Sequence, residues 1–320
     1  MSNSHLLLEI LRATESAAIA AHILVGKGDE KAADQLAVNA MRLALNTMNI
    51  DGTVVIGEGE RDEAPMLYIG EKVGTGEGIK VDVALDPLEG TTILATGGQN
   101  ALAVIAMAQQ GGFLHAPDVY MDKIAIGFEY EERIIDLDNS PKINLQNIAK
   151  AKKCDISELV TVILDRPRHQ QLIAKVREAG ARVNLIRDGD VAAVIATATG
   201  ANIDVYMGIG GAPEGVLAAA ALCTTGGQMC GKLIFSKEEE KQRALKMGIT
   251  DFSRQYLLED LAFGDIVFAA TGVTEGSMLN GITISAKGIF THSLVMHSLT
   301  KTIRKIETFY DTAMTKARSL

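Results

Sequence analysis

Hydrophobic and polar residues alternate along residues 79–85, so that the branched apolar side chains fall on one side of an extended chain. This pattern predicts a strand with one face in a hydrophobic core. Asp86 stands at the end of the strand. Pro87 has no N–H to donate to a neighbouring strand and therefore predicts that the strand stops there. The continuous apolar run of residues 101–108 predicts a second, fully buried strand.

Residues 5–24 and 29–48 repeat their apolar residues at helical spacing, which predicts two helices. The apolar stripe of the second helix, extended backwards, reaches Asp34. An acid on such a stripe needs a partner if it is buried. Alternatively, an acid in the first turn simply favours the helix dipole. The pattern alone leaves both interpretations open.

From about residue 158 the pattern changes to alternating strands and helices, which predicts an α/β fold with a mostly parallel layer in this half. The change places a domain boundary near residues 155–160 and gives two domains, 1–157 and 158–320. The predicted strands are 160–164, 182–186, 203–207 and 232–235, and the helices are about 169–179, 190–199 and 214–225.

The 320 residues are 47% apolar and 22% charged, as in soluble globular proteins. A net charge of −9, an aromatic content of 4% and the absence of Trp argue against nucleic acid as a partner. The N-terminus has no signal-peptide layout and no apolar run is long enough to span a membrane, so no membrane partner is expected. Three cysteines without metal-ligand spacing predict reduced thiols in a cytoplasmic protein.

The turn after the first predicted strand brings two carboxylates, Asp86 and Glu89, close together. They repel each other unless a cation lies between them. Gly90 allows a sharp turn, and Thr91 and Thr92 add hydroxyls. This combination suits a site for a hard metal ion, although any Asp-Pro-x-x-Gly sequence can also form a polar surface turn.

A second acidic stretch, residues 57–63, has four acids in seven residues. A solvated loop is the usual explanation of such a charge run. Its glycines would also let Glu58 or Glu60 reach a neighbouring site.

Polar residues follow three of the predicted parallel strands, at the sheet edge where ligands bind in α/β proteins. They are two arginines for anions (Arg166, Arg168), two aspartates for hydroxyls or lysines (Asp188, Asp190), and Glu214 in a glycine-rich turn. The glycine-rich turn does not fit the nucleotide-binding pattern Gly-x-Gly-x-x-Gly, because Pro213 stands where the pattern from residue 208 needs its last glycine. Residues 226–232 fit a phosphate-binding loop, but Leu233 supplies no hydroxyl for magnesium.

Seven motifs in one order make the chain similar to a known family. They are Gly28-Asp29-Glu30-Lys31-Ala32-Ala33-Asp34, Val55-Ile56-Gly57-Glu58-Gly59-Glu60, Asp86-Pro87-Leu88-Glu89-Gly90-Thr91, Ala116-Pro117-Asp118-Val119-Tyr120, Arg166-Pro167-Arg168-His169, Asp188-Gly189-Asp190 and Gly210-Gly211-Ala212-Pro213-Glu214-Gly215. From about residue 10 to about residue 305 the chain resembles the class II fructose-1,6-bisphosphatases of bacteria, which belong to the lithium-sensitive, metal-dependent sugar phosphatases.

The resemblance implies a sugar-phosphatase fold of alternating helix and sheet layers, with a metal-binding domain before residue 158 and a substrate-binding domain after it. It implies Thr91 and Glu89 as catalytic residues. The implied ligands of Mn²⁺ or Mg²⁺ are Asp34, Glu58, Asp86, Glu89 and Glu214. The implied substrate contacts are Glu89, Gly90, Thr91, Tyr120, Arg166, Pro167, Arg168, Asp188, Gly189, Asp190 and Gly211.

The expected activity is hydrolysis of the 1-phosphate of fructose 1,6-bisphosphate, as in gluconeogenesis, by a homo-oligomer such as a dimer or tetramer. Alternatives are sedoheptulose 1,7-bisphosphate or inositol monophosphate as substrate, or a sugar-phosphate sensor without catalysis, against which Thr91 and the acidic residues argue. The wider superfamily has Asp at the position of Glu89 and a Trp-Asp signature that this chain lacks. Both departures fit class II, and they leave open whether the site binds two or three metal ions.

Overall fold

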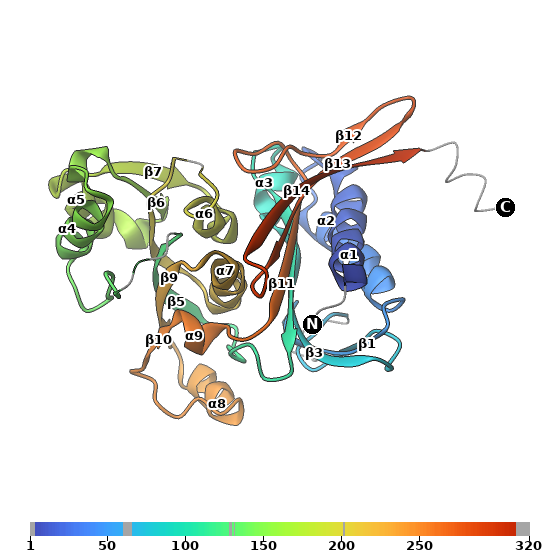
Figure 1. The fold of residues 1–320 in the computed structure, drawn as a ribbon, viewed down its shortest axis with the longest axis horizontal. Helices are drawn as coiled ribbons and strands as arrows, with labels where there is room; N and C mark the ends of the chain where they lie inside the picture. Colours follow the sequence, from blue (N-terminus) through green and yellow to red (C-terminus); the bar gives the residue numbers. More distant parts are fainter. Residues whose placement is uncertain (1–3, 60–65, 128–129, 131, 201, 312–320) are drawn as a thin grey trace. The chain divides into compact units, whose positions relative to one another are not determined.

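A computed structural model describes residues 4–59, 66–127, 130, 132–200 and 202–311 (Figure 1). The chain divides into two compact units, each built around one sheet. The first unit comprises the described residues up to Gln109 and those from Val267 onward, and the second comprises Gln110–Ile266.

These units differ from the division at residue 157 that the sequence pattern suggests. Strand β5 (Tyr120–Ile126) pairs with β8 (Val205–Gly211) and β9 (Gln228–Ile234), so the chain enters the second unit well before residue 157. Strand β11 (Ile266–Gly272) lies in the first sheet next to β4 (Leu102–Gln109). A change of pattern along the chain reports the type of element and not its distant partner, which explains the difference.

The first sheet has the strand order β12-β13-β11-β4-β3-β1-β2, with β14 also paired to β13. Helices α1 (Ser4–His22) and α2 (Glu30–Leu45) pack against each other and against β3. The remaining elements of the unit are β1 (Ile50–Ile56), β2 (Lys72–Val73), β3 (Ile79–Glu89), α3 (Thr91–Ala95), β12 (Thr283–Ile284), β13 (Gly288–His297) and β14 (Thr302–Asp311).

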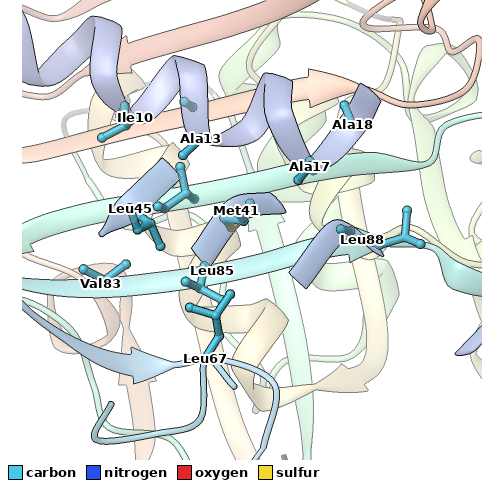
Figure 2. Close-up of a cluster of buried hydrophobic side chains, with 14 of the residues drawn as sticks. Ile10, Ala13, Ala17, Ala18, Met41, Leu45, Leu67, Val83, Leu85 and Leu88 are labelled. Atoms are coloured by element: carbon cyan, nitrogen blue, oxygen red, sulfur yellow. The ribbon is translucent and has the colours of Figure 1, made fainter. Parts of the chain in front are cut away.

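The core of this unit lies between the two long helices and β3 (Figure 2). Val83 and Leu85 of β3 are buried together with Ile10 of α1 and with Met41 and Leu45 of α2. Val81, Val83 and Leu85 of the alternating set are buried as predicted, whereas Ile79 at the start of the strand is 44% exposed. Burying several such side chains at about 1.5–3 kcal/mol each holds the helices on the sheet.

Strand β3 does not stop at Asp86, which corrects the prediction made from Pro87. Asp86 pairs with Val104 and Glu89 with Leu102, so two residues of β3 face only one residue of β4 between these pairs. This is a β-bulge, a place in a sheet that tolerates proline because the ladder of hydrogen bonds is already interrupted there. The bulge carries the strand through to Glu89.

The second sheet has the strand order β10-β9-β5-β8-β6-β7. Strand β6 (Val160–Leu164) is parallel to β7 (Arg182–Ile186) and to β8, as the strand–helix alternation predicts. Strand β5 lies between β8 and β9 and is antiparallel to both, and β10 is antiparallel to β9. The sheet is therefore mixed, which corrects the prediction of a mostly parallel layer, because the strand–helix alternation does not show that β5 enters this sheet from an earlier part of the chain. The remaining elements are α4 (Pro141–Lys152), α5 (Gln170–Glu178), α6 (Asp190–Ala196), α7 (Ala212–Thr225), α8 (Glu238–Lys246), β10 (Gln255–Leu257) and α9 (Leu258–Leu261), with short 3-10 turns at Ile156–Glu158 and Pro167–His169.

Helices α4 and α5 lie on one face of this sheet, and α6 and α7 lie on the other (Figure 1). The predicted mixture of helix and sheet layers is confirmed in both units. Within the part of the chain that the structure describes, no helix is long and apolar enough to cross a membrane.

Candidate active site

The bulge at the end of β3 presents the two carboxylates of the central turn. Asp86 is half-buried, and its Oδ1 accepts a hydrogen bond of 3.0 Å from the N–H of Leu88. Glu89 is only 3% exposed. A polar surface turn, the alternative interpretation of this stretch, does not fit the burial of Glu89. The two acids instead lie at the C-terminal end of β3, a strand of the core.

Gly90 connects the bulge to α3. Its φ of +89° lies in the left-handed region, where a side chain would be strained, and Thr91 opens the helix directly after it. Thr91 is half-buried, whereas Thr92 is exposed. The two hydroxyls next to Glu89 therefore differ in environment.

Asp34 lies beyond the first turn of α2, which argues against its interpretation as a dipole-favouring acid. Asp29 caps this helix by accepting a hydrogen bond of 3.0 Å from the N–H of Ala32, and Glu30 is the acid of the first turn. Burial raises the pKa of Asp34 above the usual value of an aspartate. Such a carboxylate gains from a cation bound beside it.

The loop before α2 is attached to α3. The N–H groups of Gly26 and Gly28 donate hydrogen bonds of 2.9 and 3.0 Å to the carbonyls of Leu94 and Ala95. Since α2 also packs on α3, the helix that carries Asp34 begins beside the helix that Thr91 opens.

Glu58 follows β1 in the loop expected from the glycines. It is half-buried, and its N–H donates a hydrogen bond of 3.0 Å to the carbonyl of Leu67. A Cβ on Gly57 would lie 2.1 Å from the same carbonyl oxygen, so the close approach of the two segments requires glycine there. Glu60, the other candidate in this stretch, lies outside the described residues.

In the second unit, Arg168 joins the ends of two neighbouring strands. It lies in the 3-10 turn after β6, and its Nε and Nη2 donate hydrogen bonds of 3.1 and 2.8 Å to the carbonyl of Ile209 in β8. Its guanidinium stacks over the ring of Tyr120, 4.8 Å from the centroid. Arg166 and Pro167 precede it in the same turn. The structure thus brings Tyr120 and Arg168 together.

His169, which has no role among the predicted site residues, connects the same two strands through hydrogen bonds at both ring nitrogens. The N–H of Ile209 donates a hydrogen bond of 2.8 Å to Nε2, so Nδ1 carries the proton and donates to the carbonyl of Leu164 at 2.7 Å. Burial lowers the pKa of His169, which favours this neutral form. Its position directly after Arg168 was the only signal in the sequence.

Asp188, Gly189 and Asp190 form the start of α6. Gly189 has a φ of +87°, and its N–H donates a hydrogen bond of 3.1 Å to Oδ1 of Asp188. Asp190 is buried and accepts a hydrogen bond of 2.5 Å from Nζ of Lys123. The sequence suggested hydroxyls or lysines as partners of these aspartates but did not identify Lys123, which lies in β5.

Glu214 lies in the first turn of α7. Its Oε2 is buried and has no hydrogen-bond partner among the described residues. Burial, reinforced by the negative charge of Asp190, raises the pKa of Glu214 to about 7. A Cβ on Gly211 would lie 1.8 Å from Oε2, so only glycine leaves room for this carboxylate.

The predicted site residues fall into two groups. The first unit contains the residues Asp34, Glu58, Asp86, Glu89, Gly90 and Thr91. The second unit contains the residues Tyr120, Arg166, Pro167, Arg168, Asp188, Gly189, Asp190, Gly211 and Glu214. Within residues 4–59, 66–127, 130, 132–200 and 202–311, no three His, Cys, Asp or Glu side chains lie close enough together to hold a metal ion.

Comparison with known proteins assigns the chain to a family. Residues 4–310 match the model of the family described as bacterial fructose-1,6-bisphosphatase, glpX-encoded. The chain belongs to this family. It is 46% identical to fructose-1,6-bisphosphatase 1 class 2 of Escherichia coli (strain K12), over 95% of both chains. It is 44% identical to the D-fructose 1,6-bisphosphatase class 2/sedoheptulose 1,7-bisphosphatase of Trichodesmium erythraeum, over 98% of both chains.

The acidic residues of this bisphosphatase-family chain suit a divalent cation by their chemistry. The five candidate ligands, Asp34, Glu58, Asp86, Glu89 and Glu214, offer carboxylate oxygens, the donors that hard cations such as Mg²⁺ and Mn²⁺ prefer. Burial raises the pKa of Asp34 and of Glu214, and Oε2 of Glu214 has no donor among the described residues. A bound cation would offset the cost of burying these charges.

Proposed function

We propose that this chain hydrolyses the 1-phosphate of fructose 1,6-bisphosphate to give fructose 6-phosphate and inorganic phosphate. The observation that carries the proposal is the similarity over nearly the full length to class 2 fructose-1,6-bisphosphatases, with 46% identity over 95% of both chains in one case. The arginines and buried carboxylates described above provide the residue types that such a reaction needs.

The proposed ligands of Mn²⁺ or Mg²⁺ are the five acids Asp34, Glu58, Asp86, Glu89 and Glu214. When bound, a divalent ion offsets the negative charge that develops on the transferred phosphoryl group. The raised pKa values of Asp34 and Glu214 support a role in cation binding, because a cation stabilises the ionised form of a buried carboxylate.

Thr91 is proposed to orient the attacking water through its hydroxyl, with Glu89 as the carboxylate that can accept a proton. The half-buried position of Thr91, two residues after the buried Glu89, supports this pairing. A positioned acid–base group typically contributes 10²–10⁴-fold to a rate, so the pair is expected to matter without supplying the whole acceleration.

Arg166 and Arg168 are proposed to bind the second phosphate, which does not react. Its binding energy positions the phosphate that does. Tyr120, Asp188 and Asp190 are proposed to hold the sugar. Two arginines in one short turn favour a bisphosphate over a monophosphate, because a monophosphate needs no second anion site.

Sedoheptulose 1,7-bisphosphate is a second candidate substrate. The relative from Trichodesmium erythraeum, 44% identical to this chain, is named for both bisphosphatase activities. We further propose a cytoplasmic homo-oligomer, a dimer or tetramer. Three free cysteines support the reducing compartment, and the commonness of symmetric assemblies supports the oligomer.

Phosphate release from a panel of substrates tests the proposal. Fructose 1,6-bisphosphate, sedoheptulose 1,7-bisphosphate and inositol monophosphate are compared, each with Mn²⁺, with Mg²⁺ and with a chelator. We expect bisphosphates to be hydrolysed with metal only and the monophosphate to react far more slowly. Preference for inositol monophosphate, or equal turnover with the chelator, would contradict the proposal.

A further inference from the structure

Lys123 is a fully buried lysine in the middle of β5, with only 1% of its surface exposed. Burying an ammonium group costs several kcal/mol unless a counter-charge and hydrogen bonds replace its water. Its Nζ donates hydrogen bonds of 2.5 Å to Oδ2 of Asp190 and of 2.9 Å to the carbonyl of Gly211. Both partners belong to the proposed substrate-binding residues, whereas Lys123 does not.

Two glycines leave the room that this ion pair occupies. A Cβ on Gly210 would lie 2.1 Å from Oδ2 of Asp190 and 2.9 Å from Nζ of Lys123. A Cβ on Gly215 would lie 3.2 Å from Cδ of Lys123. At Gly210 the backbone of β8 therefore approaches the pair too closely for a Cβ, whereas the atom nearest to a Cβ on Gly215 is Sδ of Met121, at 2.8 Å.

The donors around Asp190 reach only one of its oxygens. Oδ2 accepts from Lys123 and, at 3.4 Å, from the hydroxyl of Tyr206. Among the described residues, no donor reaches Oδ1. A carboxylate held through one oxygen keeps the other available as an acceptor for a hydroxyl of a ligand.

We propose that Lys123 is a positioning residue for substrate binding, in extension of the proposed function. Anchored by the carbonyl of Gly211, its Nζ holds the carboxylate of Asp190 in a single orientation through Oδ2. Oδ1 is thereby kept ready to accept a hydrogen bond from a sugar hydroxyl. The role of Lys123 in binding runs through Asp190, so removal of either residue removes the same interaction.

The test compares Lys123→Met, Asp190→Asn and the double variant with the wild-type chain. Met keeps the length of the lysine stem without its charge. We expect Lys123→Met to raise KM for fructose 1,6-bisphosphate about 10- to 100-fold, the range for a lost hydrogen bond to a charged group, with a smaller change in kcat. The double variant should match Asp190→Asn within about twofold, because coupled residues do not add.

Two controls separate this role from a purely structural one. Lys232→Met makes the same change at an exposed lysine on the neighbouring β9 and should leave KM unchanged. If Lys123→Met leaves an unpaired carboxylate and does not fold, the double variant, which buries neither charge, still gives the comparison with Asp190→Asn. A normal KM in Lys123→Met, or a double variant with the summed loss, overturns the inference.

Calorimetric binding of fructose 6-phosphate gives a readout that does not need turnover. We expect its Kd to rise in Lys123→Met and in Asp190→Asn by similar factors. An active wild type with unchanged Kd in Lys123→Met overturns this inference alone. A wild-type chain that neither hydrolyses the bisphosphate nor binds fructose 6-phosphate overturns the proposed function, and the role of Lys123 with it.

Discussion

Among single residues, Glu214 gives the clearest chemical signal in the second unit. A buried carboxylate oxygen without a hydrogen-bond partner among the described residues, in a group whose pKa is raised to about 7, is poorly satisfied by the protein itself. The ionised form gains from a bound cation, and cation binding to a half-protonated carboxylate releases protons.

We therefore predict that binding of Mn²⁺ near pH 7 releases protons from the wild-type chain and fewer from Glu214→Gln, with activity abolished in the variant. Calorimetry in two buffers of different ionisation enthalpy measures the released protons. Glu178→Gln, at an exposed position of α5, is the control and should behave as wild type. Equal proton release from Glu214→Gln would remove Glu214 from the ligand set.

Thr91 and Thr92 form a matched pair for the second prediction, because they are adjacent and only Thr91 is half-buried. Thr91→Ser keeps the hydroxyl and should retain substantial activity. Thr91→Ala should lose roughly 10²–10⁴-fold in kcat with little change in KM. Thr92→Ala should be mild. Steady-state kinetics that show equal activity for the two alanine variants would leave Thr91 without a catalytic role.

The arginines of the turn after β6 carry the third prediction. Arg166→Ala should weaken binding of a bisphosphate by about 1.5–3 kcal/mol, as for a hydrogen bond to a charged group, and should hardly affect a monophosphate. Arg168→Ala should do the same and also loosen β8, because Arg168 donates to the carbonyl of Ile209. KM values for both substrate types measure this. Equal losses of affinity for the bisphosphate and for the monophosphate would show that the arginines do not bind the non-reacting phosphate.

Residue types and spacing suggested which positions are candidates for the site, but not the surroundings of those positions. The acids at 86 and 89 were visible in the sequence, and their burial was not. Asp34 looked like a first-turn acid because the pattern does not show that Asp29 caps the helix. Lys123 was overlooked because its partners, Asp190 and Gly211, are distant in the sequence and become visible only once β5, α6 and β8 are brought together.

At the scale of elements, strand–helix alternation identified β6, β7 and β8 correctly, together with the helices between them. The bulge in β3 was not predictable from Pro87 alone, since it depends on the pairing with β4. Strands β13 and β14, ten residues each, carried no predicted element. Tertiary pairing, which local pattern does not contain, defines all three.

The strand ends that carry the arginines depend on His169, and this dependence predicts an effect of pH. Burial lowers the pKa of His169 below 6.5, and the neutral ring accepts from the N–H of Ile209. Between the lowered pKa and 6.5 the unfolded chain binds more protons, so stability falls as the pH falls through this window and is fully present above it.

The wild-type chain should therefore lose more stability between pH 7.5 and pH 5.5 than His169→Gln, which has no proton to gain. Urea denaturation midpoints at the two pH values measure the loss. The difference between the two proteins isolates the histidine from other titrating groups. Parallel losses in both proteins would show that His169 does not titrate differently in the folded state.

For the whole molecule, the motifs in sequence order predicted the family, and comparison over nearly the full length confirmed it. The division into compact units could not be predicted from the sequence pattern, because β11 and the strands after it belong to the first sheet although they lie far along the chain.

The central claim is that this chain removes one particular phosphate from fructose 1,6-bisphosphate. Phosphorus NMR of the bisphosphate with the full chain and Mn²⁺ tests it directly, because the two ester phosphates and free phosphate have separate resonances. We expect loss of the 1-phosphate signal, one equivalent of free phosphate and an intact 6-phosphate. An unchanged spectrum, or loss of the 6-phosphate first, would contradict it.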